Sequence, residues 1–166
     1  MARDLTAGMI AEVAAAALRP VAFVEVEVVS SPLAPVRVWS GYGSKSWNGH
    51  TWLGVGHFGG ISAIAESTEV FANGIKLTLS GIPSDMITTA LADLNQGLPA
   101  TVWLGALSEA EAVVADPYEA FSGRVDLVQV VEGADTATIE ISVENNLIDL
   151  QRPRELRYTD ADQQKL

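Results

Sequence analysis

The sequence predicts a mainly β fold, a barrel or a sandwich, with one or two helices packed against it. Several segments alternate apolar and polar residues with the period of two that half-buried strands require. Glycine-rich and Asn-Gly turn signals separate these segments at short intervals. Helical spacing occurs in only two places, and these do not alternate regularly with the strands, which argues against a parallel α/β sheet.

The chain is long enough for one domain, which we place at residues 1–150, followed by a polar, basic arm at residues 151–166. Its net charge of -11 disfavours specific binding to nucleic acid or to an anionic membrane, although an acidic surface would suit a channel through which DNA slides. There is no cysteine, so thiol catalysis and thiolate metal sites are excluded. No apolar run is long enough to insert into a membrane, and the N-terminus lacks the pattern of a signal peptide.

In the first part of the chain, the pattern predicts a helix, two strands and a hairpin. The helix is capped by Asp4 or Thr6 and continues to about Leu18, before Pro20 ends it. The next segments, Val21–Val29 and Val36–Ser40, alternate as strands. Asn48-Gly49 is the dipeptide that most favours a type I′ turn, because both central positions of that turn need a positive φ.

The second part of the chain predicts further strands around one more helix. Asn73-Gly74 marks a turn or bulge, and Pro83 or Ser84 begins a helix that continues to about Asp93. An acidic loop is predicted between Ser108 and Asp116. The predicted strands are Ile61–Glu66, Thr68–Ser80 with a separate strand possible at Thr68–Phe71, Pro99–Leu107, Phe121–Val131 and Ala137–Val143.

The residues that could support catalysis have plainer structural interpretations. Gly54–Gly59 matches the G-x-G-x-x-G string of dinucleotide-binding turns, but no convincing helix follows, so we interpret it as a glycine-rich loop. His50 and His57 are expected to be surface or structural residues, since no cysteine accompanies them as a metal ligand. No serine lies in a G-x-S-x-G turn. We therefore predict that the chain is not an enzyme and has no catalytic, cofactor-binding or metal-binding residues.

Carboxylates are plentiful, and two pairs share a strand face, Glu25 with Glu27 and Glu140 with Glu144. A solvated strand face is the interpretation that an acidic protein favours. A hydrolase remains an alternative that would need two acidic side chains to meet in a cleft, about 5 to 9 Å apart.

Three of the four tryptophans, Trp39, Trp47 and Trp52, lie close together in the glycine-rich region. Large aromatic side chains in such a setting form either a small core or a contact surface. If the three rings were coplanar and exposed, they would form a platform for sugars. A carbohydrate-binding β-sandwich is therefore the main alternative function.

Five phrases of the sequence, taken in order, resemble small tail proteins of bacteriophages and prophages, specifically tail-tip or baseplate hub-like structural proteins. The phrases are 37–41, 47–56, 73–83, 121–126 and the stretch from Arg152-Pro153-Arg154 to Gln163-Gln164. The resemblance implies a fold similar to tail-tube and hub domains, which assemble into rings around the DNA channel. It implies no cofactor and no catalytic residue, and the lack of cysteine separates this chain from tail-tip proteins that carry a metal cluster.

The resulting expectation is a virion tail protein, assembled in the bacterial host cytoplasm, that contacts copies of itself in a trimeric or hexameric ring and other tail proteins. Sheet edges, an acidic surface and a basic arm all suit such an assembly. The arm could dock on the acidic face of a neighbouring copy, or it could be a disordered tail. The predicted interface residues are Trp39, Trp47, Trp52, His57 and Phe58 in the glycine-rich region, and Arg152, Arg154, Arg157 and Tyr158 in the arm.

Overall fold

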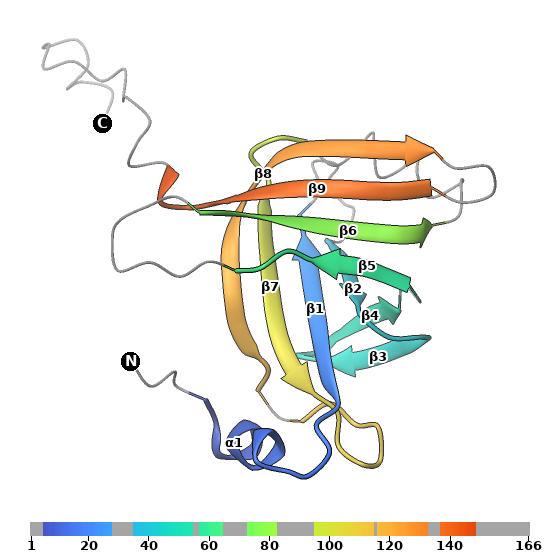
Figure 1. Cartoon of the computed structure of the whole chain (residues 1–166), viewed down its shortest axis with the longest axis vertical. Helices are drawn as coiled ribbons and strands as arrows, with labels where there is room; N and C mark the ends of the chain where they lie inside the picture. Colours follow the sequence, from blue (N-terminus) through green and yellow to red (C-terminus); the bar gives the residue numbers. More distant parts are fainter. Residues whose placement is uncertain are drawn as a thin grey trace, which may run out of the picture.

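The computed structural model describes residues 5–27, 35–54, 57–64, 73–82, 95–114, 116–132 and 137–148. These residues form one short helix and a mixed sheet of nine strands (Figure 1). The elements, in chain order, are α1 (Ala7–Val13), β1 (Pro20–Val26), β2 (Val36–Trp39), β3 (Ser44–Trp47), β4 (His50–Gly54), β5 (His57–Ile61), β6 (Gly74–Ile82), β7 (Pro99–Ala106), β8 (Tyr118–Glu132) and β9 (Ala137–Asn145).

The strands follow the order β3-β4-β2-β1-β7-β8-β9-β6-β5 across the sheet. All neighbouring strands are antiparallel except β2 and β4, which are parallel. Among the described strands, β3 and β5 form the two edges and do not pair with each other, so the sheet is not closed into a barrel. The mainly β prediction is confirmed, and the curled, open sheet is closer to a sandwich than to a barrel.

The long strand β8 joins the two parts of the sheet. Its pairing with β9 shifts by one residue between Val125 and Leu127, which makes a bulge. Bulges bend a strand and increase its twist. Figure 1 shows the result, since β8 runs beside β7 and β1 over its first half and then turns to run beside β9 and β6.

The main hydrophobic core lies inside this curl. It contains residues from six strands, and the buried side chains alternate along each strand, so that one face of every strand contributes. Leu77 and Ile141 are opposite each other on β6 and β9, and both are almost completely buried. The core residues are Val24, Val26, Val38, Ile75, Leu77, Ala100, Val102, Phe121, Val125, Ile139, Ile141 and Val143.

A second, smaller core covers the opposite face of β1. Phe23 points away from Val24 because successive side chains of a strand face opposite sides, and it packs in a separate cluster with Val21, Trp39 and Trp52. β1 is therefore buried on both faces, as a central strand covered by a second layer must be. The second layer is the β3–β4 hairpin, which folds over the outside of the sheet.

The hairpin confirms the turn predicted at Asn48-Gly49. Trp47 pairs with His50, which leaves a two-residue turn, and φ is +51° at Asn48 and +71° at Gly49. Positive φ at both positions is what a type I′ turn requires. The predicted strand of β7 and the predicted hairpin of β8 and β9 are also confirmed.

Two predictions about local structure were wrong. The helix ends at Val13 rather than near Leu18, because Ala14–Ala17 have no large side chain to bury and packing, more than propensity, maintains short helices. The strand predicted at Ile61–Glu66 begins earlier, as β5 at His57–Ile61, so the segment interpreted as a glycine-rich loop is partly strand. The helix predicted from Pro83 or Ser84 and the strand predicted at Thr68–Phe71 lie outside the described residues. No described helix has the length and hydrophobicity needed to span a membrane.

Candidate interaction surface

All four tryptophans gather around Phe23 on the outer face of the sheet. The ring centroids of Trp47 and Trp52 lie 4.9 and 5.2 Å from that of Phe23. Trp103 completes the group, with its centroid 5.5 Å from Trp47 and 5.7 Å from Trp52. Most of these contacts are tilted or edge-to-face, the arrangements that aromatic rings prefer. The cluster therefore attaches the hairpin to the sheet.

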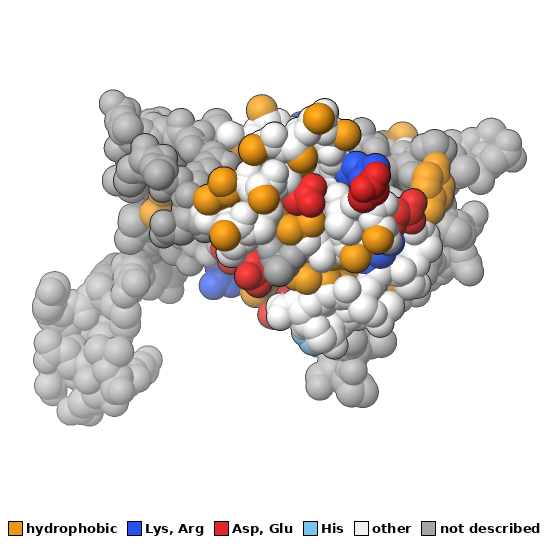
Figure 2. All heavy atoms as spheres, turned by 90° about the horizontal axis from the view of Figure 1, so that it is seen from below, with side chains coloured by type: hydrophobic (Ala, Val, Ile, Leu, Met, Phe, Trp, Pro, Cys, Tyr) orange, Lys and Arg blue, Asp and Glu red, His pale blue; other side chains and the backbone are white. Residues whose placement is uncertain are grey.

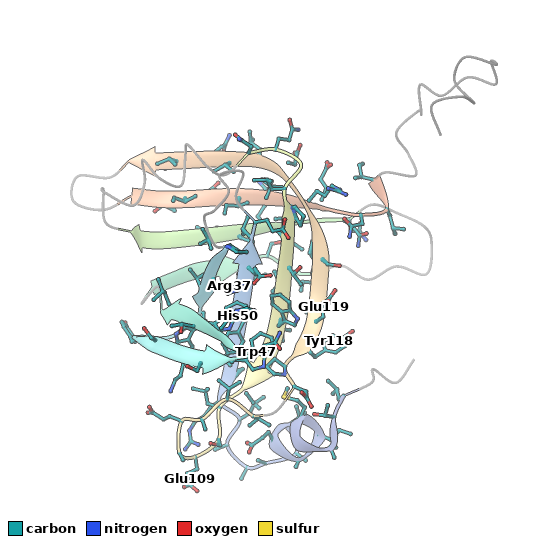
Figure 3. The ribbon with its side chains drawn as sticks, turned by 180° about the vertical axis from the view of Figure 1, so that it is seen from behind. Arg37, Trp47, His50, Glu109, Tyr118 and Glu119 are labelled. Atoms are coloured by element: carbon teal, nitrogen blue, oxygen red, sulfur yellow. The ribbon has the colours of Figure 1, made fainter. Side chains whose placement is uncertain are left out.

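One indole hydrogen bond lies within the hairpin, and a second joins β2 to the segment that leads into it. Trp52 Nε1 donates to the Trp47 carbonyl oxygen at 3.0 Å, and Trp39 Nε1 donates to the Gly43 carbonyl oxygen at 3.0 Å. Figure 3 shows Trp47 and His50 at the hairpin tip, lying over the sheet between Arg37 of β2 and Glu119 of β8. Asn48, Gly49 and His50 are exposed there. The hairpin tip is therefore polar and exposed, and the aromatic cluster beneath it holds it to the sheet.

The three tryptophans predicted at an interface, one in β2 and two in the hairpin, differ in their exposure. Trp39 and Trp52 are 4% and 1% exposed, whereas Trp47 is half-buried. The rings of Trp47 and Trp52 are tilted by 35°. These three rings are neither coplanar nor all exposed, so they form no sugar platform. Trp39 and Trp52 can influence a partner only by holding the hairpin backbone in place, and their interface role stays a prediction.

The other predicted interface residues lie mainly beyond the structural description. The backbone of His57 and Phe58 lies in β5, the strand at one edge of the sheet, but their side chains are outside the described part. Arg152, Arg154, Arg157 and Tyr158 also lie outside the described residues. Their interface roles therefore stay predictions.

The carboxylates singled out in the sequence have surroundings that differ from those of a glycosidase pair. Glu25 forms an ion pair with Arg37 on the neighbouring strand, so its charge is already balanced. Glu140 and Glu144 lie four residues apart on β9, which corresponds to roughly 13 Å along a strand and exceeds the spacing of a glycosidase pair. Among the described residues there is no group of three or more His, Asp or Glu side chains that could hold a metal ion.

An apolar surface that was not predicted from the sequence lies at the end of the molecule that carries α1. Met9 is buried, but Ile10 and Val13 are 56% and 54% exposed, and Leu18 after the helix is also exposed. Figure 2 views this end and shows hydrophobic side chains gathered over it, with acidic and some basic ones among them. The sequence signal was present, since Glu12 is the only charged residue between Thr6 and Leu18.

The loop after β7 lies beside this surface and is held by several hydrogen bonds. Ser108 N donates to the Ala112 carbonyl oxygen at 2.8 Å, and Val114 N donates to the Ala106 carbonyl oxygen at 2.9 Å. Lys45 Nζ of β3 donates to the Glu111 carbonyl oxygen at 2.6 Å. We call this segment, residues 107–114, the acidic loop. Through Lys45 it contacts the β3–β4 hairpin, and through Val114 it contacts α1.

No protein-family model matches the chain, and no curated protein matches its sequence. Among solved structures, a chain in the virion of a native gene transfer agent (GTA) particle has a similar fold, with a TM-score of 0.63 and 16% sequence identity. The match covers 92% of this chain and 49% of that chain, so this chain spans about half the length of its structural neighbour. At this identity the likeness establishes a shared fold.

Proposed function

We propose that the chain is a structural component of a phage or prophage tail tip or baseplate, and that it acts by self-association and by contacts with other tail proteins around the DNA channel. The observation that carries this proposal is the fold shared with a virion chain over 92% of the present chain. In this proposal the chain is not an enzyme and works without a cofactor.

Two features of the structure support an assembly role. The two edge strands of the sheet, β3 and β5, each pair with a strand on one side only among the described residues. An unpaired strand edge is a site where another chain can add a strand. The buried side chains of the described core are all apolar, and in this proposal they serve only to pack the sheet. The carbohydrate-binding alternative loses its main support, because its platform required exposed, coplanar tryptophans.

The self-association is tested by measuring molar mass with light scattering over a range of concentrations, on the full chain and on a version that ends before Gln151. We expect the full chain to form a trimer or hexamer, because the tail proteins that it resembles assemble into rings and because head-to-tail contacts between identical subunits form a ring when the rotation closes. The shortened version should dissociate at concentrations where the full chain is assembled. A full chain that remains monomeric at every concentration would contradict self-association by the chain alone.

A further inference from the structure

We propose that the apolar and acidic surface around α1 is the docking site for residues 151–158 of a neighbouring copy. This inference rests on the proposed function, because it names the surface through which the copies associate. Its elements are the exposed face of α1 and the following alanines, together with the acidic loop.

The α1 segment has the composition of a covered helix. Ile10 and Val13 lie three residues apart and therefore share a helical face, and both are more than half exposed. The alanines from Ala14 to Ala17, which follow the helix, are exposed as well. A surface helix normally carries charged residues on its outer side. Contiguous apolar side chains in that position indicate a surface that another polypeptide covers.

Acidic side chains lie at the same end of the molecule as this apolar face. A methyl group placed on Gly8 would touch Val114 at 3.4 Å, so α1 lies directly against the end of the acidic loop. Glu109 and Glu111 are exposed on that loop, whose backbone is fixed by Lys45 and by its own hydrogen bonds. Figure 3 shows Glu109 at the same end of the molecule as α1. A partner must therefore offer apolar side chains and positive charge together.

Residues 151–158 have this combination. They contain three arginines, Arg152, Arg154 and Arg157, together with Leu156 and Tyr158, and Glu155 is the only acidic residue among them. The arm as a whole, residues 151–166, carries four basic and three acidic residues, whereas the rest of the chain carries six basic and 18 acidic residues. Arginine forms paired hydrogen bonds with carboxylates, and complementary charge directs association.

The absence of cysteine allows a direct test by cross-linking. One preparation carries Val13→Cys and a second carries Leu156→Cys, and the two are mixed and treated with a short bis-maleimide reagent. The matched control replaces the first preparation by Val131→Cys, since Val131 on β8 is exposed to the same degree, 57% against 54%. We expect the 13–156 product to form at least about tenfold faster than the 131–156 product, because docking raises the effective concentration of the two thiols.

A 13–156 rate equal to that of the control would overturn the proposal. So would a product that forms only within a single chain carrying both cysteines and never between two chains, since the arm would then dock on its own subunit. Molar mass measured on the same samples separates the two failures. A chain that assembles without this cross-link retains the proposed self-association and loses only the docking site, whereas a monomer without the cross-link loses both.

A charge exchange provides an independent test that needs no cysteine. Replacing the three arginines by glutamate in Arg152→Glu/Arg154→Glu/Arg157→Glu should abolish docking, and Arg→Lys at the same positions should preserve most of it. Adding Glu109→Lys and Glu111→Lys to the charge-reversed arm should restore assembly. If the restored variant remains as dissociated as the charge-reversed one, the acidic loop is not the site.

Discussion

Replacing Trp52 by alanine is expected to lower the free energy of unfolding by about 4 kcal/mol, because a large buried ring is removed and a cavity remains. Trp52 is 1% exposed and contacts Phe23, Trp47 and Trp103. The substitution also removes the indole donor that binds the Trp47 carbonyl oxygen across the hairpin. Urea unfolding followed by tryptophan fluorescence measures the loss.

The matched control for this substitution is Leu53→Ala in the same strand. Leu53 is 49% exposed and points to the other side of β4. Its truncation should therefore lower the free energy of unfolding by less than about 1 kcal/mol. Typical domains are stable by only about 5 to 15 kcal/mol, so Trp52→Ala should also raise the population of unfolded chain at physiological temperature. Equal losses for the two variants would contradict a tryptophan core on the outer face of β1.

Gly123→Ala is expected to lower the free energy of unfolding by about 2 to 3 kcal/mol through overpacking. A methyl group on Gly123 would overlap the Glu144 carbonyl oxygen of β9 and would lie 3.0 Å from an atom of the Phe121 ring. The first of these neighbours is backbone, which cannot rotate away. β9 would have to move from β8 at the point where β8 pairs with both β7 and β9.

Ser122→Ala is the control for this position, because Ser122 is the adjacent residue of β8 and is only half-buried. Ser122→Ala is expected to change the free energy of unfolding by no more than about 0.5 kcal/mol, the usual range for substitutions away from the core. Both variants are compared by chemical denaturation. If Gly123→Ala is as stable as Ser122→Ala, the close approach of β8 and β9 described here is wrong.

The elements that were predicted correctly depend on neighbours in the sequence. Alternation identified β8 and β9 because each has one face in the main core, whereas β7 was predicted from its short apolar run. The Asn48-Gly49 turn could be predicted because its two residues are among those that accept positive φ. β5 was displaced because its Gly59-Gly60 pair has no side chains from which a period can be read. The parallel pairing of β2 with β4 depends on how the β3–β4 hairpin packs against the sheet. No pattern of neighbouring residues predicts this packing.

The candidate interaction surface likewise combines features that neighbouring residues predict with features that depend on distant segments. Trp39, Trp47 and Trp52 pack together in a small core, one of the two arrangements expected for them, but Trp103 could not be connected with them from the sequence. The register of β1 with β7 places Trp103 beside Phe23, and such a pairing between distant segments is decided by the whole sheet. Burial of Trp39 and Trp52 likewise depends on the hairpin folding back over β1. The exposed face of α1 could have been noticed, because a helix with one charge has no polar side.

The central claim is that this chain is part of a virion tail tip. The most direct measurement is to purify particles from the host strain that encodes the chain, identify their proteins by mass spectrometry, and locate the chain with gold-labelled antibody in electron micrographs. We expect the chain in intact particles, with the label at the end of the tail distal to the head. Particles that are complete and lack the chain, or label on the head alone, would contradict the claim.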